Sequence, residues 1–170
     1  GMVVVNVNPL YTPRELAYQL KDSGATAIVV LENFAHTLAQ VVENTPIRTV
    51  ITTQVGDLLP PLKRLLTNTV VKYVKKMVPP WQMDSAVDFK QVLAVGRAQS
   101  LDDVALTHDD LAFLQYTGGT TGVAKGTMLT HGNMVANVLQ VAAWMSPNLN
   151  DGEEHLGIPR AGNHGFALTG

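Results

Sequence analysis

The first fifty residues alternate between short apolar runs and segments with helical spacing, and this alternation constrains the fold more than any other feature. Runs rich in β-branched residues occupy positions 3–7, 27–31 and 49–52, as expected for buried parallel strands. The segments between these runs place apolar residues along one side of a helix. The order strand, helix, strand, helix, strand predicts an α/β fold with a layered, mostly parallel sheet and flanking helices.

The first predicted helix carries clear start and stop signals. Thr12 precedes Pro13, and Glu15 stands three positions after Thr12, which is the pattern of a capping box with proline at the first helical position. Gly24 follows the last residue with helical spacing and predicts the end of this helix. A second helix is predicted over residues 34–42, where apolar residues again recur at helical intervals.

The composition excludes several classes of protein. With 46% hydrophobic and 15% charged residues, the chain is too apolar to be intrinsically disordered. No apolar run approaches the roughly 18–20 residues of a transmembrane helix, and the first residues lack the basic region of a secretory signal. The absence of cysteine excludes disulfides and thiolate zinc sites. A net charge of −2 argues against nucleic-acid binding. We expect a cytoplasmic location.

A basic segment lies in the middle of the chain. Residues 58–83 contain five basic and no acidic side chains, so this segment carries +5 and the remainder −7. We favour a surface helix with its apolar stripe on the core and its lysines in water. The alternative is peripheral contact of residues 62–77 with an anionic membrane at its cytoplasmic face. The stripe consists of Leu62, Leu65, Leu66, Val70, Tyr73, Val74 and Met77.

The chemistry is concentrated in a glycine- and threonine-rich segment that follows a predicted strand at residues 111–116. Residues 117–126 hold four glycines, three threonines and one lysine. Glycines let backbone N–H groups approach a ligand, and hydroxyls and a lysine add partners for phosphate oxygens. The segment is not a Walker loop, because Ala124 stands where glycine would precede the lysine, and it contains no dinucleotide fingerprint. It predicts a polyphosphate site; a simple hairpin turn is the alternative.

The same segment resembles the phosphate-binding signature of the acyl-adenylate-forming, AMP-binding superfamily, with Ala124 in place of the usual proline. Residues 8–16, 22–25 and 128–133 further resemble bacterial long-chain fatty-acid–CoA ligases. The resemblance implies that a fatty acid reacts with Mg-ATP to give an acyl-adenylate, from which CoA displaces AMP. ATP, Mg²⁺ and CoA would therefore be required, but no acidic magnesium ligand is evident in the sequence.

The resemblance also implies roles for individual residues. Residues 117–122 would surround the β- and γ-phosphates, with the hydroxyls of Thr120 and Thr121 as donors, and Lys125 would support the loop or its charge. The candidate nucleotide-binding residues are Tyr116, Thr117, Gly118, Gly119, Thr120, Thr121, Gly122, Val123, Ala124, Lys125, Gly126 and Thr127.

A further helix is expected after this segment. Thr130 would cap it, and His131 fits a role at the helix start or on the surface better than catalysis. The apolar residues of this helix are expected in the core, namely Met134, Val135, Val138, Leu139 and Val141. His164 resembles the histidine of a family segment near the acyl and nucleotide pockets, although residues 158–163 differ from that pattern.

The resemblance divides the chain into a βαβαβ unit (1–53), a helical basic insert and connection (58–110), a strand, phosphate loop and helix (111–145), and a divergent tail (146–170). Later family motifs do not occur in this sequence, so we expect a partial N-terminal domain without the C-terminal domain, inactive alone. Two alternatives stay open: a non-catalytic nucleotide-binding or interaction module, and an enzyme that adenylates another carboxylic acid. The sequence predicts no oligomeric state.

Overall fold

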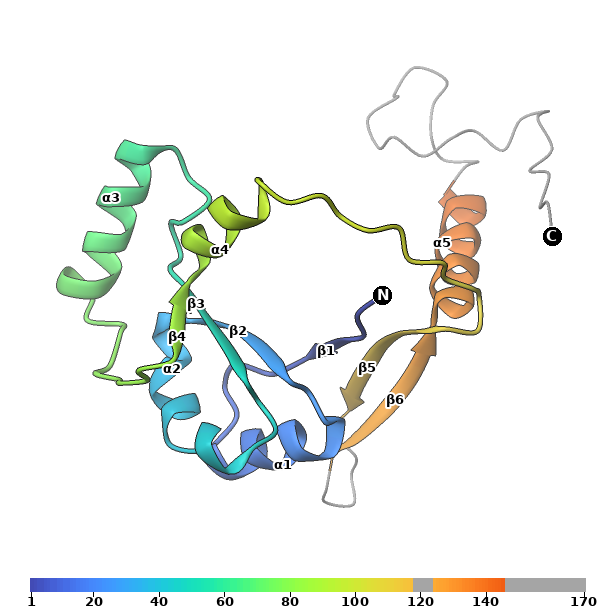
Figure 1. Cartoon of the computed structure of the whole chain (residues 1–170), viewed down its shortest axis with the longest axis horizontal. Helices are drawn as coiled ribbons and strands as arrows, with labels where there is room; N and C mark the ends of the chain where they lie inside the picture. The colour runs from blue at the N-terminus through green and yellow to red at the C-terminus, as the bar shows by residue number, and fades with distance from the viewer. Residues whose placement is uncertain (118–123, 146–170) are drawn as a thin grey trace.

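The computed structural model describes residues 1–117 and 124–145 (Figure 1). Its helices and strands follow one another in the predicted alternation through the first half of the chain. In chain order they are β1 (Val4–Asn6), α1 (Pro13–Ser23), β2 (Ala27–Leu31), α2 (Glu32–Ala39), the 3₁₀ turn η1 (Val42–Asn44), β3 (Thr49–Thr53), α3 (Pro61–Thr69), the π-helical turn η2 (Val70–Val74), β4 (Ala86–Asp88), α4 (Phe89–Gly96), β5 (Leu111–Thr117), β6 (Lys125–Thr130) and α5 (His131–Met145).

The described strands form two three-stranded sheets. One has the order β2-β3-β4 and is entirely parallel. The other has the order β1-β5-β6, in which β1 is parallel and β6 antiparallel to β5 (Figure 1). The predicted α/β class with a mostly parallel sheet arrangement is thereby confirmed.

The expectation that the first three strands share one sheet is wrong. β1 pairs with β5, so that Val4 lies opposite Phe113, while β2 pairs with β3. β1 is also partly exposed, in contrast to the buried strand that its apolar sequence predicts. Pairing between strands more than one hundred residues apart depends on long-range packing, which the local pattern of a strand does not contain.

Helix α1 begins and ends where the sequence predicts. The Thr12 hydroxyl accepts from the Glu15 N–H at 3.4 Å, and the Glu15 carboxylate accepts from the Thr12 N–H at 2.8 Å. Gly24 has a φ of +63° and its N–H donates to the carbonyl of Lys21. Both ends of the helix are thus satisfied by local hydrogen bonds.

The core lies where α1 and α2 pack on the β2-β3-β4 sheet. Its fully buried apolar side chains are Leu16 and Leu20 of α1, Leu38 of α2 and Val50 of β3. Helix α2 is shorter than predicted, because the backbone leaves helical geometry at Val41 and continues as a 3₁₀ turn.

Two apolar helix faces that we expected in the core are exposed. On α5, the side chains of Val135, Val138, Leu139 and Val141 are 47–60% exposed. The stripe along α3 and η2 is also exposed except for Val70, which is half-buried, so the favoured interpretation of a stripe packed on the core is wrong. The physical reason is placement: no described element covers either face, because α5 meets β5 and β6 only at its first turns and α3 extends away from the sheets (Figure 1).

Candidate phosphate-binding site

The glycine- and threonine-rich segment connects the two strands of a β-hairpin. β5 and β6 are antiparallel, and Thr117 lies opposite Lys125 as the last pair before the connection. The two interpretations of this segment, a hairpin turn and a phosphate loop, are therefore compatible. The hairpin fixes where the two ends of the loop lie.

Tyr116 holds this end of the hairpin against α1. Its ring is buried, with 8% exposed, and its hydroxyl donates to Oδ2 of Asp22 at 2.6 Å. Burial raises the pKa of the Tyr116 phenol well above its ordinary value, and the Asp22 carboxylate raises it further. Tyr116 is thus a neutral donor to a carboxylate, a charge-assisted hydrogen bond between segments 94 residues apart.

Gly126 makes room for the Tyr116 ring. The two residues are cross-strand partners, and a Cβ atom added at Gly126 would lie 3.0 Å from Cζ and 3.1 Å from Cε2 of the tyrosine. Contacts at these distances are tighter than nine in ten real Cβ contacts, so the ring would have to shift by a few tenths of an ångström. The glycine after the lysine therefore leaves room for the Tyr116 ring to pack beneath the loop.

A second set of hydrogen bonds ties α1 to the same sheet. The side-chain amide of Gln19 donates to the Asn6 carbonyl at 2.8 Å, and the Asn6 amide donates to Oε1 of Gln115 at 2.9 Å. Gln19 is almost fully buried. Together with Asp22, it places α1 in contact with both β1 and β5, so the hairpin cannot shift along α1 without breaking these hydrogen bonds.

The remaining described candidates lie on the other side of the hairpin. Side chains alternate along a strand, so Thr117, Lys125 and Thr127 point away from the face that Tyr116 and Gly126 share. All three are exposed, and Ala124 is partly exposed. The ammonium group of Lys125 is thus available to a ligand at the neck of the loop. Six candidates lie outside the described residues, namely Gly118, Gly119, Thr120, Thr121, Gly122 and Val123, and so does His164.

The helix that follows the hairpin begins as predicted. The Thr130 hydroxyl accepts from the Asn133 N–H at 3.2 Å, and the Asn133 side chain accepts from the Thr130 N–H at 3.0 Å. The backbone N–H of His131 donates to the Asp110 carbonyl at 2.9 Å. His131 therefore has the predicted role at the helix start, where its backbone joins α5 to the turn before β5.

The described residues do not form a metal site. No three histidine, aspartate or glutamate side chains within residues 1–117 and 124–145 lie close enough together to hold a metal ion. The donor set that magnesium prefers is composed of several oxygen ligands. Within these ranges the structure therefore offers no cluster of protein side chains that would hold a magnesium ion by itself.

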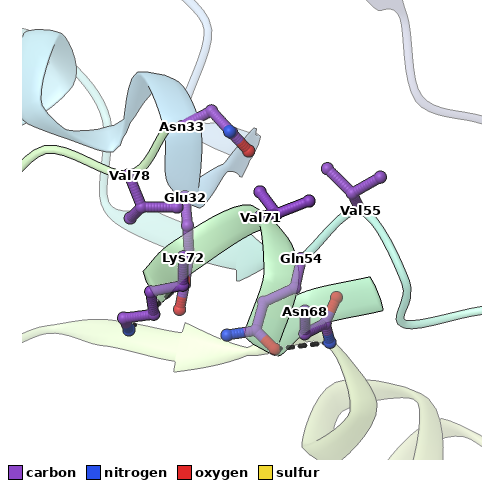
Figure 2. A pocket seen from close by; sticks show the side chains of 8 residues that line it. All are labelled: Glu32, Asn33, Gln54, Val55, Asn68, Val71, Lys72 and Val78. Carbon is purple, nitrogen blue, oxygen red and sulfur yellow. Dashed lines mark hydrogen bonds and ion pairs between the residues drawn. The ribbon is translucent and has the colours of Figure 1, made fainter. Parts of the chain in front are cut away.

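The described cavities lie away from the hairpin, near α3. Figure 2 shows the smaller one, between α2, the end of β3 and η2, where Asn68 donates to Gln54. Its volume of about 10 Å³ accommodates at most one water molecule. A larger open cleft of about 480 Å³ lies beside α3 and carries the cationic residues Arg64, Lys72 and Lys90. Two of these cations already face carboxylates, since Lys72 pairs with Glu32 and Lys90 with Asp57.

Asp22 is the functional residue whose role sequence reasoning missed. It lies in the last turn of α1, where the helix dipole disfavours a negative charge. A carboxylate in that position indicates a compensating partner elsewhere, and the partner is the Tyr116 hydroxyl. The signal was present in the sequence, but it did not identify the partner.

Comparison with known proteins gives a consistent result. The family model described as "AMP-binding enzyme" matches residues 1–158. The long-chain-fatty-acid–CoA ligase of Escherichia coli O157:H7 is 54% identical over 169 residues, which is 99% of this chain and 30% of that protein. The chain thus spans about a third of the length of the curated relatives it matches.

Two solved structures support the same fold. The crystal structure of a long-chain-fatty-acid–CoA ligase from Archaeoglobus fulgidus superimposes with a TM-score of 0.51 and 32% identity, covering 81% of this chain and 22% of that one. The adenylation domain of a carboxylate reductase from Mycobacterium chelonae gives a TM-score of 0.56 at 20% identity, covering 81% and 21% of the two chains. At 20% identity the second likeness concerns the fold alone.

The hydrogen bond between Tyr116 and Asp22 predicts a measurable loss of stability. Tyr116→Phe should lower the free energy of unfolding in urea by about 2 kcal/mol, because a part-buried hydrogen bond to a charged group is lost. Tyr18→Phe, which changes an exposed tyrosine on α1, the helix that carries Asp22, should change the free energy of unfolding by less than about 0.5 kcal/mol. A double-mutant cycle with Asp22→Ala should give a coupling energy of similar size to the loss; equal effects of the two phenylalanine variants would contradict the assignment.

The raised pKa of Tyr116 predicts its behaviour at high pH. A folded-state pKa above the unfolded value of about 10 means that the contribution of this group to stability is complete below that pH and declines as the pH rises further. In a spectrophotometric titration of tyrosinate, the difference between the wild type and Tyr116→Phe should correspond to a phenol that ionises above the ordinary range. A difference curve centred near the ordinary value would show that the phenol is not held as described.

Proposed function

Because the chain belongs to the family of AMP-binding enzymes, we propose that it supplies the phosphate-binding hairpin of a long-chain fatty-acid–CoA ligase. The overall reaction consumes ATP, a fatty acid and CoA, and yields acyl-CoA, AMP and pyrophosphate. The proposal for the acid rests on the names and 54% identity of the bacterial relatives. The proposal for the nucleotide rests on the family and on the hairpin.

The observation that carries the proposal is the way the two ends of the loop are held. Tyr116 is fixed to Asp22 just before residues 118–123, and Gly126 packs on the same ring just after them. A loop with both ends held needs less ordering when it binds a ligand, and this lowers the entropic cost of binding a polyphosphate. Lys125, exposed at the neck of the loop, adds a cation beside it.

The proposed chemistry requires this arrangement because negative charges must approach one another. In the first step a carboxylate oxygen attacks the α-phosphorus of ATP, a P–O bond forms, and pyrophosphate leaves with the electron pair of the broken P–O bond. In the second step the sulfur of CoA attacks the acyl carbon and AMP leaves. The residues of this chain would bind and orient the β- and γ-phosphates, through backbone N–H groups, the hydroxyls of Thr120 and Thr121, and Lys125.

We propose that magnesium enters the site together with ATP and is not held by a separate set of protein ligands. When bound, it would neutralise phosphate charge as pyrophosphate departs. The described residues offer no set of three ligands for it, so we propose that ATP brings the ion. Titrating ATP in the presence and absence of a chelator tests this assignment.

ATP binding to the chain is the first test of the proposed function. Isothermal titration with Mg-ATP should detect binding, and Lys125→Ala should weaken it at least about tenfold, since charge-assisted hydrogen bonds are worth about 1.5–3 kcal/mol. Thr121→Ala should weaken it as well. Lys21→Ala removes an exposed cation from α1 and should leave binding unchanged. Absence of ATP binding, or an equal loss in the Lys21 variant, would show that the hairpin is not a phosphate site.

The identity of the acid is tested on a protein that contains this chain and has the full length of the curated relatives. ATP–pyrophosphate exchange should be stimulated by palmitate much more than by benzoate or acetate, because only a long chain fills a pocket for a long acyl group. Stimulation by an aryl or short-chain acid instead would retain the adenylating chemistry and contradict the fatty-acid assignment. Exchange with no acid at all would contradict both.

A further inference from the structure

The open cleft of about 480 Å³ beside α3 lies at the edge of the parallel sheet where β3 and β4 end. We call it the cationic cleft. Arg64 and Lys72 line it from α3 and η2. Gln54, which directly follows β3, and Lys90, the second residue of α4, line it from the sheet. Segments at the carboxyl ends of parallel strands are the usual location of ligand sites in α/β folds, and the volume is within the range of such sites.

The charge of the cationic cleft selects an anionic ligand. Arg64, Lys72 and Lys90 line it, whereas none of the lining residues that the structure describes is an aspartate or a glutamate. Arg64 is half-buried, and its guanidinium forms no ion pair with any residue in the ranges 1–117 and 124–145. A guanidinium presents a planar fork of N–H donors that matches the oxygens of phosphates. Arg64 therefore offers a charged donor group to an anion in the cleft.

The two lysines of the cleft keep their capacity for hydrogen bonds. Nζ of Lys72 lies 3.5 Å from Oε2 of Glu32, and Nζ of Lys90 lies 3.8 Å from Oδ1 of Asp57. Both distances exceed the upper value of about 3.2 Å for an ordinary N–H···O hydrogen bond. The carboxylate side chains are only 15% and 1% exposed, whereas the lysine side chains are 40% and 42% exposed. The carboxylates thus attract and position the lysines, and the ammonium N–H groups stay available to a ligand.

Hydrogen bonds fix the walls of the cleft relative to each other. The amide of Asn68 donates to Oε1 of Gln54 at 2.7 Å and to Oδ1 of Asp57 at 3.4 Å, and its carbonyl oxygen accepts from the Gly56 N–H at 2.8 Å. These bonds hold α3 to the end of β3. Figure 2 shows that the oxygen of Gln54 faces Asn68 while its nitrogen points away. The cleft is thus formed before a ligand binds, which lowers the entropic cost of binding.

The spacing of the cations and one aromatic side chain define the class of ligand. Arg64 and Lys72 are eight residues apart, so their Cα atoms are separated by on the order of 10 Å along the helix. Two linked phosphates span more of that separation than a single phosphate does. Tyr73 lines the same cleft and is 69% exposed, so its ring offers a face on which an aromatic base can stack.

We propose that the cationic cleft binds a soluble nucleoside diphosphate, with Arg64, Lys72 and Lys90 on the phosphate oxygens and the base on the Tyr73 ring. The cleft includes no residue of the hairpin. Binding in the cleft is therefore independent of ATP binding at the hairpin and of the identity of the acid.

A titration followed by NMR tests the proposal, because its signals distinguish the cleft from the hairpin. Adding ADP to the isotope-labelled chain should shift the side-chain amide signals of Gln54 and Asn68, and high salt should weaken this binding. Arg64→Gln should raise the dissociation constant obtained from these signals at least about tenfold, because charge-assisted hydrogen bonds are lost. Tyr73→Leu should raise it at least about fivefold for ADP, because base stacking is lost, and should leave the affinity for inorganic pyrophosphate unchanged.

A matched control lies one residue from Arg64. Lys63→Gln removes the same charge from an exposed side chain of α3 that does not line the cleft, and it should change the dissociation constant by less than about twofold, because water and salt screen that charge. Folding of every variant is verified by circular dichroism.

Four outcomes overturn the proposal. The first is that ADP shifts no signal of the cleft, and the second is that the Arg64 and Lys63 variants lose equal affinity. The third is that inorganic phosphate binds as tightly as inorganic pyrophosphate, which would indicate a site for a single anionic group. The fourth is that Tyr73→Leu weakens the binding of ADP and of pyrophosphate equally, which would show that the ring does not contact a base.

Discussion

The hydrogen bond between Tyr116 and Asp22 is the interaction on which the arrangement of this molecule depends. It joins the last turn of α1 to the strand that enters the glycine-rich segment. Helix α1 also packs Leu16 and Leu20 into the core of the other sheet. One helix therefore contacts both sheets, with apolar side chains in the core and with the polar groups of Asp22 and Gln19 on the other sheet. Because the buried Tyr116 donates to a charged carboxylate, the contact is costly to break, and it fixes the hairpin relative to the parallel sheet.

The same contact explains why the motif is longer than a ligand alone requires. Tyr116 and Gly126 flank the candidate phosphate loop and pack on each other as cross-strand partners. The ring occupies the volume that a side chain at position 126 would fill. The motif residues that pack on the protein and the exposed residues Thr117, Lys125 and Thr127 are thus on two different faces of one hairpin. The position of α1 determines which face of the hairpin packs on the protein and which face is exposed.

The orientation of α3 shows that a helix follows its strongest contacts and not its average amphipathicity. The apolar stripe alone favours packing on the core. Asn68 satisfies the backbone and side chains at the end of β3, and those polar groups would be costly to leave without partners once they are shielded from water. The polar face therefore contacts the protein, and the apolar face meets solvent. The comparable exposure of α5 has a different origin, because that helix contacts the hairpin only through its first turns.

The features that the sequence predicted correctly are those set by interactions between residues close together in the chain. Thr12, Glu15 and Gly24 predicted the two ends of α1, Thr130 predicted the start of α5, and the residues of the motif predicted a phosphate loop and its family, because each of these signals acts within a few residues. Only the tertiary structure decided that β1 pairs with β5, that Asp22 is the partner of Tyr116, and that two apolar helix faces stay open. Those outcomes depend on contacts between segments that are tens of residues apart. The free energy of each contact is set by the partner residue and by the burial that this partner provides. No local sequence pattern identifies that partner.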